Sequence, residues 1–534
     1  MNKKSIYFGT LVLAALALGS CASDDTATEK PAGKDTPKTG TVFSSETEPA
    51  TRTSATYTGS GLDFYWTASD KIWVKDDNGN YNQSADDDIN TRIAAVPGST
   101  TTDKAKFWVN GTYSGGTYKV RYTGKNGVQD KVTIKASQTQ NTPNDAAHIA
   151  EDGDFGVADA TGSGAYNFTL NHKAAYVTFM PYNANGVISG AKIQKIRIYT
   201  NNTSDQLAGT FDLADNGTLS NGTTTSNSVE LNVNDFTLPS AYSYTTNGAT
   251  MVVNPGTYSN VTVEYTIRDA VTNVTGTVKK TYPSVTFDAG KNTPVRADLQ
   301  IAVYPGNNYY MWDAKQNYWY QHEWNVSNQT DRWQPTIIGE NNPNFPQNTD
   351  LERYHNGILS GSVGQRNDAQ TLRFKNLPNA NEIMWYHVYG TPHWDNDRVW
   401  GLMGHLYKGG MWIKKISKIA SEQGITTANM KSVGPNGLDF RLNNSSFSSI
   451  VTPTPAVSTP PTASDINNYF FLPALGWYDS GVLKDVGSSG CGWYWASSAG
   501  GSSSASAWGL YFTSSGVWYN NSIPCNYGIY VMEF

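Results

Sequence analysis

The sequence has few cysteines and few charged residues, and its basic residues form no long run. Only three cysteines occur in 534 residues, which excludes a fold held together by many disulfides. Charged residues make up 16% of the chain, against roughly 25% in an average soluble protein. With a net charge of −6 and no basic domain, the chain has little attraction for nucleic acid. After the first twenty residues, no segment is long and apolar enough to cross a membrane.

Glycine and small polar residues take the place of the missing charges, and aromatic residues reach 12%. Disordered chains contain few aromatic residues, so this chain is expected to fold. Asn-Gly turns at 78–79, 110–111 and 126–127 separate short apolar runs. The composition therefore favours a mainly β protein with many turns.

The N-terminus has the pattern of an export signal at residues 1–20. Lys3 and Lys4 precede the apolar run Ile6–Leu18, which is too short to span a bilayer. Leu18-Gly19-Ser20-Cys21 then resembles a bacterial lipobox, which implies cleavage before Cys21 and attachment of lipid to it. The alternative is an ordinary secretory signal that contains a cysteine. The following Ala22-Ser23-Asp24-Asp25 looks like the acidic surface-export tag of Bacteroidetes lipoproteins.

Residues 21–52 are expected to form a lipidated tether or propeptide, because they are polar and contain almost nothing to bury. Arg52 is the first arginine of the chain and lies where the tether meets the first expected strand. A trypsin-like protease could reach it there. The alternative is an exposed arginine with no role.

Two series of strand patterns follow the tether. Val132, Ile134 and Ala136 alternate with polar residues, which is the pattern of a strand with one buried face. Strands are expected at 62–66, 71–74, 105–109, 118–122 and 132–136, and then at 167–170, 175–180, 193–200, 251–253, 261–267, 285–287 and 294–303. No helical pattern interrupts either series. We predict two antiparallel β-sandwiches, at 53–164 and 165–302.

Short motifs mark the start, the middle and the end of these two series: Thr51–Ser54 with Phe64–Val74, then Phe168–Ala175, then Asp288–Lys291. In order and spacing they resemble the fimbrillins, the type V pilins and pilin-like lipoproteins of Bacteroidetes, over residues 45 to about 302. The resemblance implies proteolytic processing between Arg52 and Thr53, which removes the first strand. A strand of another subunit then fills the open groove.

The last 230 residues differ in composition. Thirteen of the sixteen tryptophans follow residue 303, which places a boundary near Val303–Gly306. Helices are expected at 380–389 and over Trp412–Ala420, with Gly424 ending the second. Residues 451–463 are expected to form a Pro/Thr-rich surface loop, and strands resume at 469–472.

The tail from Phe471 carries a second resemblance. It contains the segments Gly492–Ser498, Ala507–Phe512, Gly516–Tyr519 and Tyr527–Val531. This pattern is similar to the C-type lectin-like fold, in the branch of the major paralogous domains and the variable proteins of diversity-generating retroelements. The resemblance implies a C-type lectin-like, ligand-binding domain at 303–534, with a variable tail at about 491–530 on an exposed face.

The composition of the tail also fits a binding surface, because Tyr and Trp with Asn, Ser and Gly are typical of antibody paratopes. If Leu510 and Phe512 face the core, Tyr511 faces out, and Val517 anchors the next strand. The residues from Trp518 to Tyr527 are then expected in or beside a loop. The expected ligand-binding residues are Trp493, Trp508, Tyr511, Trp518, Asn520, Ser522, Cys525 and Tyr527. The alternative is core aromatics beside a polar loop, and Tyr494 and Trp495 are assigned to the core.

Cys491 and Cys525 are 34 residues apart in an exported chain, which permits a disulfide. Closing that loop would stabilise the fold by roughly 3–4 kcal/mol. The alternative is two unpaired cysteines at variable positions.

No catalytic, metal or cofactor pattern stands out. The Glu-Pro-Asn or Gln-Pro-Asp loop and the Trp-Asn-Asp strand of calcium-dependent lectins are absent, and so is a zincin motif. We therefore expect a protein that is not an enzyme and has no metal or cofactor. The lectin-like branch also includes formylglycine-generating oxidases, so a surface enzyme is kept as the less favoured alternative.

These features together predict a cell-surface adhesin, in the role of the tip subunit of a type V pilus. The expected partners are a pilin stalk subunit, bound by donor-strand exchange, and an unknown host, bacterial or glycan ligand. A lipid anchor would hold the chain to the outer membrane before processing. The alternative is a surface lipoprotein that stays anchored.

Overall fold

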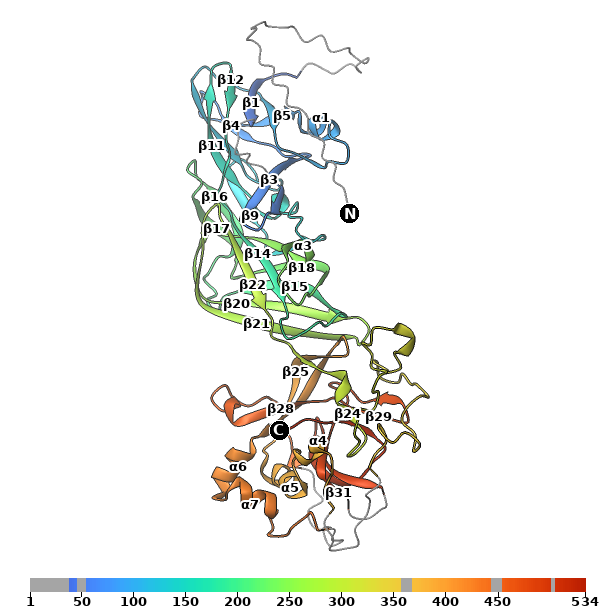
Figure 1. The fold of residues 1–534 in the computed structure, drawn as a ribbon. Helices are drawn as coiled ribbons and strands as arrows, with labels where there is room; N and C mark the ends of the chain where they lie inside the picture. Colours follow the sequence, from blue (N-terminus) through green and yellow to red (C-terminus); the bar gives the residue numbers. More distant parts are fainter. Residues whose placement is uncertain (1–37, 46–53, 357–366, 443–453, 501–504) are drawn as a thin grey trace, which may run out of the picture. The chain divides into compact units, whose positions relative to one another are not determined.

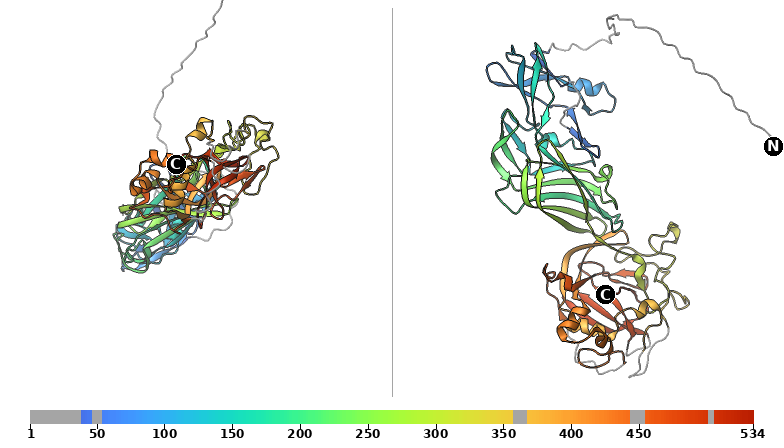
Figure 2. Two further views of the ribbon diagram at one scale, coloured as in Figure 1. Left: turned by 90° about the horizontal axis from the view of Figure 1, so that it is seen from below. Right: turned by 60° about the vertical axis from the view of Figure 1, so that its left-hand side comes forward.

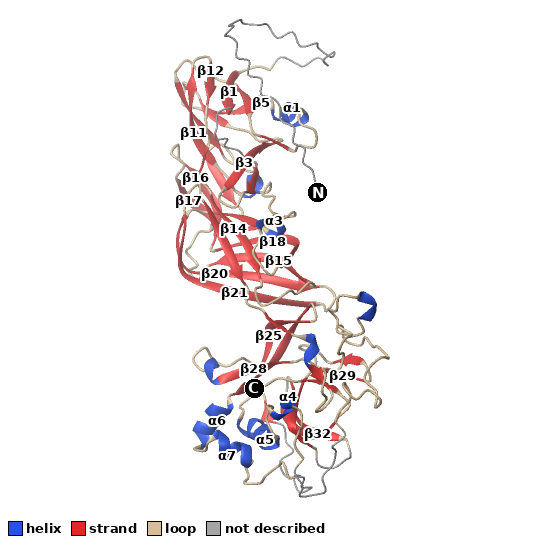
Figure 3. Cartoon of the chain, in the orientation of Figure 1, coloured by secondary structure: helices blue, strands red, loops and turns tan. Residues whose placement is uncertain are grey.

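The computed structural model describes residues 38–45, 54–356, 367–442, 454–500 and 505–534. Strands dominate these residues, and most of the helical residues lie in the C-terminal part (Figure 3). Buried apolar side chains form three clusters, which lie mainly in 43–170, 132–301 and 309–531. The prediction of a mainly β fold with an α+β C-terminal region is confirmed.

An eight-stranded sheet forms most of the first part of the chain, in the order β12-β1-β7-β5-β4-β8-β11-β13 (Figure 1). Its strands are β1 (Thr41–Ser45), β4 (Trp73–Lys75), β5 (Tyr81–Asp87), β7 (Ala105–Val109), β8 (Thr117–Tyr122), β11 (Gly156–Gly162), β12 (Ala165–Asn167) and β13 (Asn171–His172). Strands β2 (Ser54–Tyr57), β3 (Leu62–Thr67) and β6 (Thr101–Thr102) pair beside it, and α1 (Ile89–Ala94) and α2 (Ile149–Asp152) are short helices in the connections.

Strand β1 corrects the prediction that the tether has almost nothing to bury. Residues Thr41–Ser45 pair antiparallel with β7 and parallel with β12, inside the sheet. The side chain of Phe43 is fully buried, and its ring lies 5.1 Å from the rings of both Tyr113 and Tyr166. The sequence conceals this strand because its partners lie 60 or more residues away and its flanks are polar.

The second part of the chain contains three further sheets. The five-stranded sheet has the order β10-β18-β15-β20-β21, and the two three-stranded sheets have the orders β19-β14-β22 and β17-β16-β9. The bounds are β9 (Lys131–Ile134), β10 (Ser137–Gln140), β14 (Ala175–Tyr182), β15 (Ala191–Tyr199), β16 (Ala208–Leu213), β17 (Leu219–Ser226), β18 (Ser228–Thr237), β19 (Ala249–Val253), β20 (Gly256–Asp269), β21 (Val274–Phe287) and β22 (Asn292–Asp298), with α3 at Tyr244–Asn247. Strands β20 and β21 are the long pair that Figure 1 shows in yellow-green.

Pairing in these sheets differs from the prediction in three ways. Three strand pairs are parallel, namely β1–β12, β10–β18 and β14–β22, so the sheets are mixed. The short helices α1, α2 and α3 interrupt the strand series. Strands β9 and β10 pair with β16 and β18 of the second series, and Ala136 is exposed beyond the end of β9. The domain boundaries at 164/165 and 302/303 stay predictions.

The C-terminal part contains two sheets and several helices, which both views of Figure 2 show in orange and red. The four-stranded sheet has the order β23-β25-β26-β28, and the larger sheet has the order β27-β33-β32-β31-β34-β29-β30, with β24 paired to β34. The strands are β23 (Ala302–Tyr304), β24 (Tyr309–Tyr310), β25 (His393–Leu402), β26 (His405–Lys414), β27 (Thr454–Pro455), β28 (Tyr469–Pro473), β29 (Trp477–Asp479), β30 (Val482–Lys484), β31 (Gly492–Ala499), β32 (Ser506–Thr513), β33 (Gly516–Pro524) and β34 (Gly528–Tyr530). The helices are η1 (Gly306–Asn308), η2 (Gln329–Asp331), η3 (Ile466–Asn468), α4 (Leu372–Lys375), α5 (Ala380–Tyr389), α6 (Ile416–Gln423) and α7 (Thr427–Ser432).

The helix predictions are confirmed for α5 and partly wrong for α6. Helix α5 spans the predicted residues, and a capping box starts it: the side chain of Asn379 accepts from the backbone of Glu382, and that of Glu382 accepts in return. Helix α6 begins only at Ile416, because the preceding apolar residues belong to strand β26. Gly424 ends it in the left-handed conformation, with φ of 65°. The predicted surface loop at 451–463 contains the short strand β27.

The burial of Phe43 generates the first test. In the uncleaved chain, Phe43→Ala removes a fully buried ring between β7 and β12, so the free energy of unfolding should fall by about 3–5 kcal/mol. Denaturant unfolding measures this loss. The matched control Val96→Ala changes a side chain that is 58% exposed and should cost less than about 0.5 kcal/mol. Equal stability of the two variants would mean that β1 is not packed in solution.

Candidate ligand-binding face

The sheet of strands β31, β32 and β33 has two different faces, and the strand register decides which residues belong to each. Trp493 lies opposite Tyr511, and Tyr511 lies opposite Trp518. The neighbouring rows, with Leu510 and Phe512 on β32, point the other way, because successive side chains of a strand alternate between the faces. Successive rows of side chains along these strands therefore belong in turn to an inner face and an outer face.

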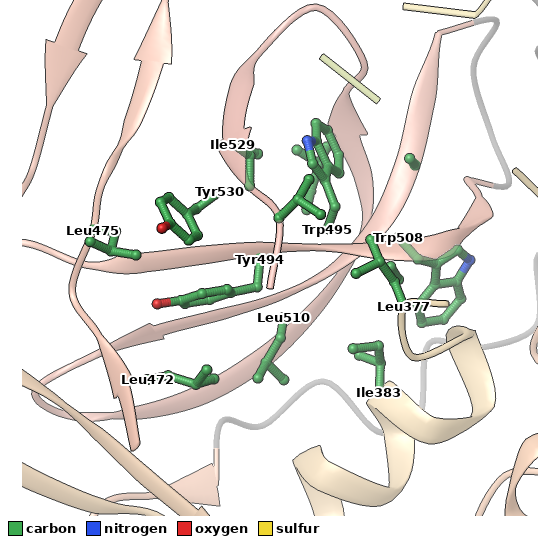
Figure 4. Close-up of a cluster of buried hydrophobic side chains, with 14 of the residues drawn as sticks. Leu377, Ile383, Leu472, Leu475, Tyr494, Trp495, Trp508, Leu510, Ile529 and Tyr530 are labelled. Carbon is green, nitrogen blue, oxygen red and sulfur yellow. The ribbon is translucent and has the colours of Figure 1, made fainter. Parts of the chain in front are cut away.

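The inner face forms the hydrophobic core of the C-terminal part. Tyr494, Leu510, Phe512 and Val517 are fully buried. Figure 4 shows Leu510 and Tyr494 on this side, with Ile383 of helix α5 approaching them. This packing determines which side of each strand faces the core, because a register shift of one residue would move all of these side chains to the solvent-exposed face. The predictions for Tyr494, Leu510, Phe512 and Val517 are confirmed.

The outer face is partly open to solvent. Trp493, Tyr511 and Trp518 are each only partly buried. The ring centroids of Trp493 and Tyr511 lie 4.3 Å apart, and those of Tyr511 and Trp518 lie 5.3 Å apart. Partial burial, with the nearby Cys491 and Asp485, raises the pKa of Tyr511. Its phenol is therefore neutral at physiological pH and keeps a proton to donate to a ligand.

One end of the same outer face is covered. Trp495 also points outward from β31, but it is 1% exposed, and its Nε1 donates to the backbone oxygen of Tyr310 at 2.8 Å. Trp312 lies beside it and donates from Nε1 to the backbone oxygen of Ala496 at 3.0 Å. The segment around β24 thus closes this end, and the assignment of Trp495 to the core is confirmed. Among the described residues, the end with Trp493, Tyr511 and Trp518 is the part of this face that stays partly exposed.

The polar residues of the tail lie on a strand and not in the predicted loop. Strand β33 runs through to Pro524, so it contains both Asn520 and Ser522. The side-chain oxygen of Asn520 accepts from the backbone N–H of Ser522 at 2.9 Å and from its hydroxyl at 3.2 Å. Ser522 is exposed, and Tyr527 is partly exposed in the turn before β34. Asn520 lies two residues beyond Trp518 on β33, so it is the one of the three that the register places next to the open end.

Trp508 was wrongly predicted to bind ligand. It is 2% exposed, stacks on Tyr519 with ring centroids 5.5 Å apart, and meets the edge of Phe440 at 6.0 Å. The reason is its position on β32, because residues 508, 510 and 512 are two apart and share the inner face. The alternation that places Tyr511 outside therefore places Trp508 inside.

The two cysteines of the tail are buried free thiols, so the possible disulfide between Cys491 and Cys525 is wrong for this structure. Cys491 precedes Gly492, which pairs with Phe512, whereas Cys525 follows Pro524, which pairs with Ser506. Six residues of β32 separate these two positions, about 20 Å at the usual rise per residue. A disulfide needs Cα atoms within about 7 Å. Cys525 is fully buried, so it cannot contact a ligand as predicted.

Sequence reasoning missed one residue of the outer face. Trp477 on β29 is partly buried, and its ring centroid lies 5.5 Å from that of Trp493. The alternation within β31–β33 gives no sign of it, because β29 reaches this face through a parallel bridge between Gly476 and Gly492. Only its position next to the tail could have drawn attention to it.

The structure adds little about the predicted lipidation and processing sites. Cys21, Arg52 and Thr53 lie outside the described residues. Among the residues that the structure describes, no group of three or more His, Cys, Asp or Glu side chains could hold a metal ion. Within the same residues, no helix has both the length and the apolar character to cross a membrane.

Comparison with known proteins finds similarity only among solved structures. No protein-family model matches the sequence, and no curated protein matches it. A candidate cell adhesion protein from Bacteroides ovatus is 16% identical, with 44% of this chain and 84% of that chain covered and a TM-score of 0.28. A candidate cell adhesion protein from Bacteroides uniformis is 14% identical (49% and 93% covered, TM-score 0.30). A fimbrial assembly protein from Parabacteroides distasonis is 11% identical (48% and 88% covered, TM-score 0.22).

These neighbours are therefore adhesion and fimbrial proteins of Bacteroides and Parabacteroides. At such low identity and TM-score, the likeness assigns neither a family nor a function to this chain. A function has to be argued from the chain's own residues.

The burial of both thiols generates the second test, on a Cys21→Ala variant that leaves only Cys491 and Cys525. Burial raises the pKa of Cys491 to about 12, and it also raises that of Cys525 above its usual range. At pH 8, about one Cys491 side chain in ten thousand is then a thiolate, the form that reacts. We expect iodoacetamide to label neither cysteine in the folded chain and both in denaturant without a reductant. Mass spectrometry that finds no free thiol in denaturant would mean that the disulfide forms after all.

Proposed function

We propose that this chain is a cell-surface adhesin that binds its ligand on the open end of the outer face of β31–β33. The single observation that supports this proposal is the row of partly exposed rings, Trp493, Tyr511 and Trp518, on a sheet whose inner face is fully buried. Aromatic side chains give much contact area for few lost rotamers. Asn520 next to this row offers an amide group for hydrogen bonds.

Rigidity is the second support for a binding role. The rings belong to adjacent strands that are paired residue by residue, and the core below them contains the large buried side chains of Tyr494 and Phe512. A binding face that is already ordered does not lose further conformational entropy when ligand binds. The free energy of the contacts then appears as affinity.

We further propose that the chain is the tip subunit of a type V pilus, matured by cleavage between Arg52 and Thr53. Such a cleavage would release β1, which lies between β7 and β12 and buries Phe43. It would leave two unpaired strand edges beside an apolar gap in the shape of one strand. A stalk subunit could fill this gap by donor-strand exchange.

The C-terminal residues favour a tip position over a stalk position. Val531 donates its backbone N–H to the oxygen of Asn308, and the ring of Phe534 lies 5.3 Å from Phe470 and 5.4 Å from Tyr386. Residues packed in this way are not free to enter a neighbouring subunit as a donor strand. In this proposal the chain accepts a strand, and these packed residues do not serve as a donor strand. Lipid at Cys21 would hold it to the outer membrane before cleavage.

The names of the neighbouring solved structures agree with this proposal, which does not depend on them. In the rival form, the chain stays anchored as an uncleaved lipoprotein. N-terminal sequencing of the protein from cells separates the two, because assembly requires Thr53 at the N-terminus and permanent anchoring requires lipidated Cys21.

The adhesin proposal predicts that single outer-face substitutions abolish adhesion without unfolding the chain. Cells that display Tyr511→Ala or Trp518→Ala should bind immobilised mucin, cultured epithelial cells or other bacteria at least about tenfold less than wild type, because each change removes a contact of roughly 1–2 kcal/mol. Adhesion counts on all three surfaces measure this. Tyr320→Ala, which changes another exposed aromatic side chain of the C-terminal part, is the matched control and should adhere normally. If both outer-face variants adhere as wild type does, the adhesin proposal is wrong for this face.

The tip proposal predicts that strand exchange depends on cleavage. A synthetic peptide of residues 38–45 should bind the chain that begins at Thr53, because it can refill the gap left by β1, and should not bind the uncleaved chain. The same peptide with Phe43→Ala is the control and should bind at least about a hundredfold more weakly. Fluorescence anisotropy of the labelled peptide measures the affinities. Equal binding by cleaved and uncleaved chains would count against the groove.

A further inference from the structure

Four aromatic rings form one continuous row across the outer face, and we call this row the aromatic strip. It consists of Trp477, Trp493, Tyr511 and Trp518, from strands β29, β31, β32 and β33. The centroids of successive rings lie 5.5, 4.3 and 5.3 Å apart. All four side chains are partly exposed. The strip includes Trp477, which lies outside the tail that the sequence marked as the binding region.

The strip is one ring wide, and its borders are polar and uncharged on the side of β33. Asn520 lies two residues beyond Trp518 on β33, and Thr513 lies two residues beyond Tyr511 on β32, toward the turn that joins the two strands. These side chains offer hydroxyl and amide groups that both donate and accept hydrogen bonds. A narrow apolar row with neutral polar edges matches an extended ligand with apolar faces and polar rims.

The charges at the other end of the strip disfavour anionic ligands. Lys484 on β30 lies opposite Trp477, and its ammonium group lies 2.7 Å from a carboxylate oxygen of Asp479. Asp485 follows it and is exposed. One lysine beside two aspartates leaves a net negative charge. Phosphate, sulfate, sialic acid and nucleic acid would all be repelled at this end.

We propose that the aromatic strip binds a neutral glycan chain, with successive sugar rings stacked on the aromatic rings. This inference rests on the proposed adhesin function and names the ligand class of the same face. The C–H groups on one side of a pyranose ring carry a slight positive charge and attract the electron-rich face of an indole or phenol ring. The hydroxyl groups at the rims of the sugars meet Asn520 and Thr513.

The tilts of the rings select the shape of that glycan. Successive ring planes differ by 64°, 38° and 40°, so the strip is a twisted staircase and not a flat platform. The twist follows from the sheet, whose strands rotate relative to their neighbours. A twisted row fits a single soluble chain, which can turn about its glycosidic bonds. A flat crystalline polysaccharide surface could touch only one or two of the rings.

The width of the strip also separates a glycan from a folded protein partner. A specific protein interface usually buries about 800 Å² on each side around a broad apolar centre. Here the apolar surface is a single row, because Trp495 in the next outer row is covered by the segment around β24 and its neighbours Gly509 and Asn520 carry no apolar side chain. A protein partner is therefore the less favoured ligand, and it becomes an outcome of the test.

The test uses the uncleaved chain, which keeps β1, and a panel of neutral hexasaccharides of β-1,4-linked glucose, xylose, mannose and N-acetylglucosamine. We expect at least one of the four to bind with quenching or a shift of tryptophan fluorescence. Trp477→Ala, Trp493→Ala and Trp518→Ala should each weaken that binding by about tenfold. Trp518→Phe keeps a ring and should retain most of it, and Tyr320→Ala should change nothing. Crystalline cellulose should bind more weakly than the soluble chain.

Two outcomes overturn the proposal. The first is that none of the four hexasaccharides binds. The second is that one binds but Trp477→Ala and Trp493→Ala bind it as wild type does, with thermal unfolding midpoints unchanged. Thermal unfolding of every variant guards against loss of the fold as the cause of weak binding.

A second measurement separates this inference from the adhesin function itself. Periodate oxidation of immobilised mucin or epithelial cells, at a concentration that cleaves vicinal diols, opens the sugar rings that carry two neighbouring free hydroxyl groups and leaves the polypeptide backbone intact. If the glycan assignment is right, adhesion is lost after periodate and is lost in Trp518→Ala. If adhesion survives periodate but is lost in Trp518→Ala, the face binds a protein, so the glycan assignment fails and the adhesin proposal stands. If Trp518→Ala adheres normally, the adhesin proposal fails as well.

Discussion

The packing of one face of the β31–β33 sheet against the core is the constraint on which the rest of the binding account depends. Leu510 lies near helix α5, and Phe512 is buried on the same side of the sheet. The strand period of two then places Tyr511 on the outer face. The cross-strand pairing then brings Trp493 and Trp518 to its two sides. Exposing these rings to water costs hydrophobic free energy, which a purely structural role would not offset. A partner that covers the rings would bury them and gain that free energy on binding.

The other end of the described chain obeys a similar constraint. Strand β1 completes a sheet by pairing with β7 on one side and β12 on the other, and its Phe43 fills the space between their side chains. A chain without this strand would have unpaired backbone groups and an apolar gap, both of which are unfavourable in water. The pairing of β1 with β7 and β12 thus stabilises the uncleaved chain. It also defines the shape of a strand that could replace β1 after cleavage.

The sequence predicted those features that depend on local pattern. Alternation placed Tyr511 outside and Leu510 inside, and the helix expected at 380–389 is α5 at its observed bounds. Where distant strands decide the structure, the prediction failed. The role of Phe43 depends on Tyr113 and Tyr166, and the parallel pairing of β10 with β18 joins residues 93 positions apart.

The errors at the candidate site have the same origin. Trp508 was assigned to the surface on composition, although its spacing from Leu510 gives it the inner face. The disulfide was judged by loop length, whereas the register of β32 sets Cys491 and Cys525 at opposite ends of the sheet. Trp477 was missed because only a long-range bridge brings it beside Trp493. Local alternation gives the direction of a side chain, and only the register gives its neighbours.

The central claim is that Trp493, Tyr511 and Trp518 are presented to solvent while the chemically similar residues beside them are not. Hydroxyl-radical footprinting of the full chain, read by mass spectrometry residue by residue, tests it most directly. The account predicts fast oxidation of Trp493, Tyr511 and Trp518, and slow oxidation of Tyr494, Trp495 and Trp508. Equal protection of the two groups would contradict it, because the outer face would then be covered in solution.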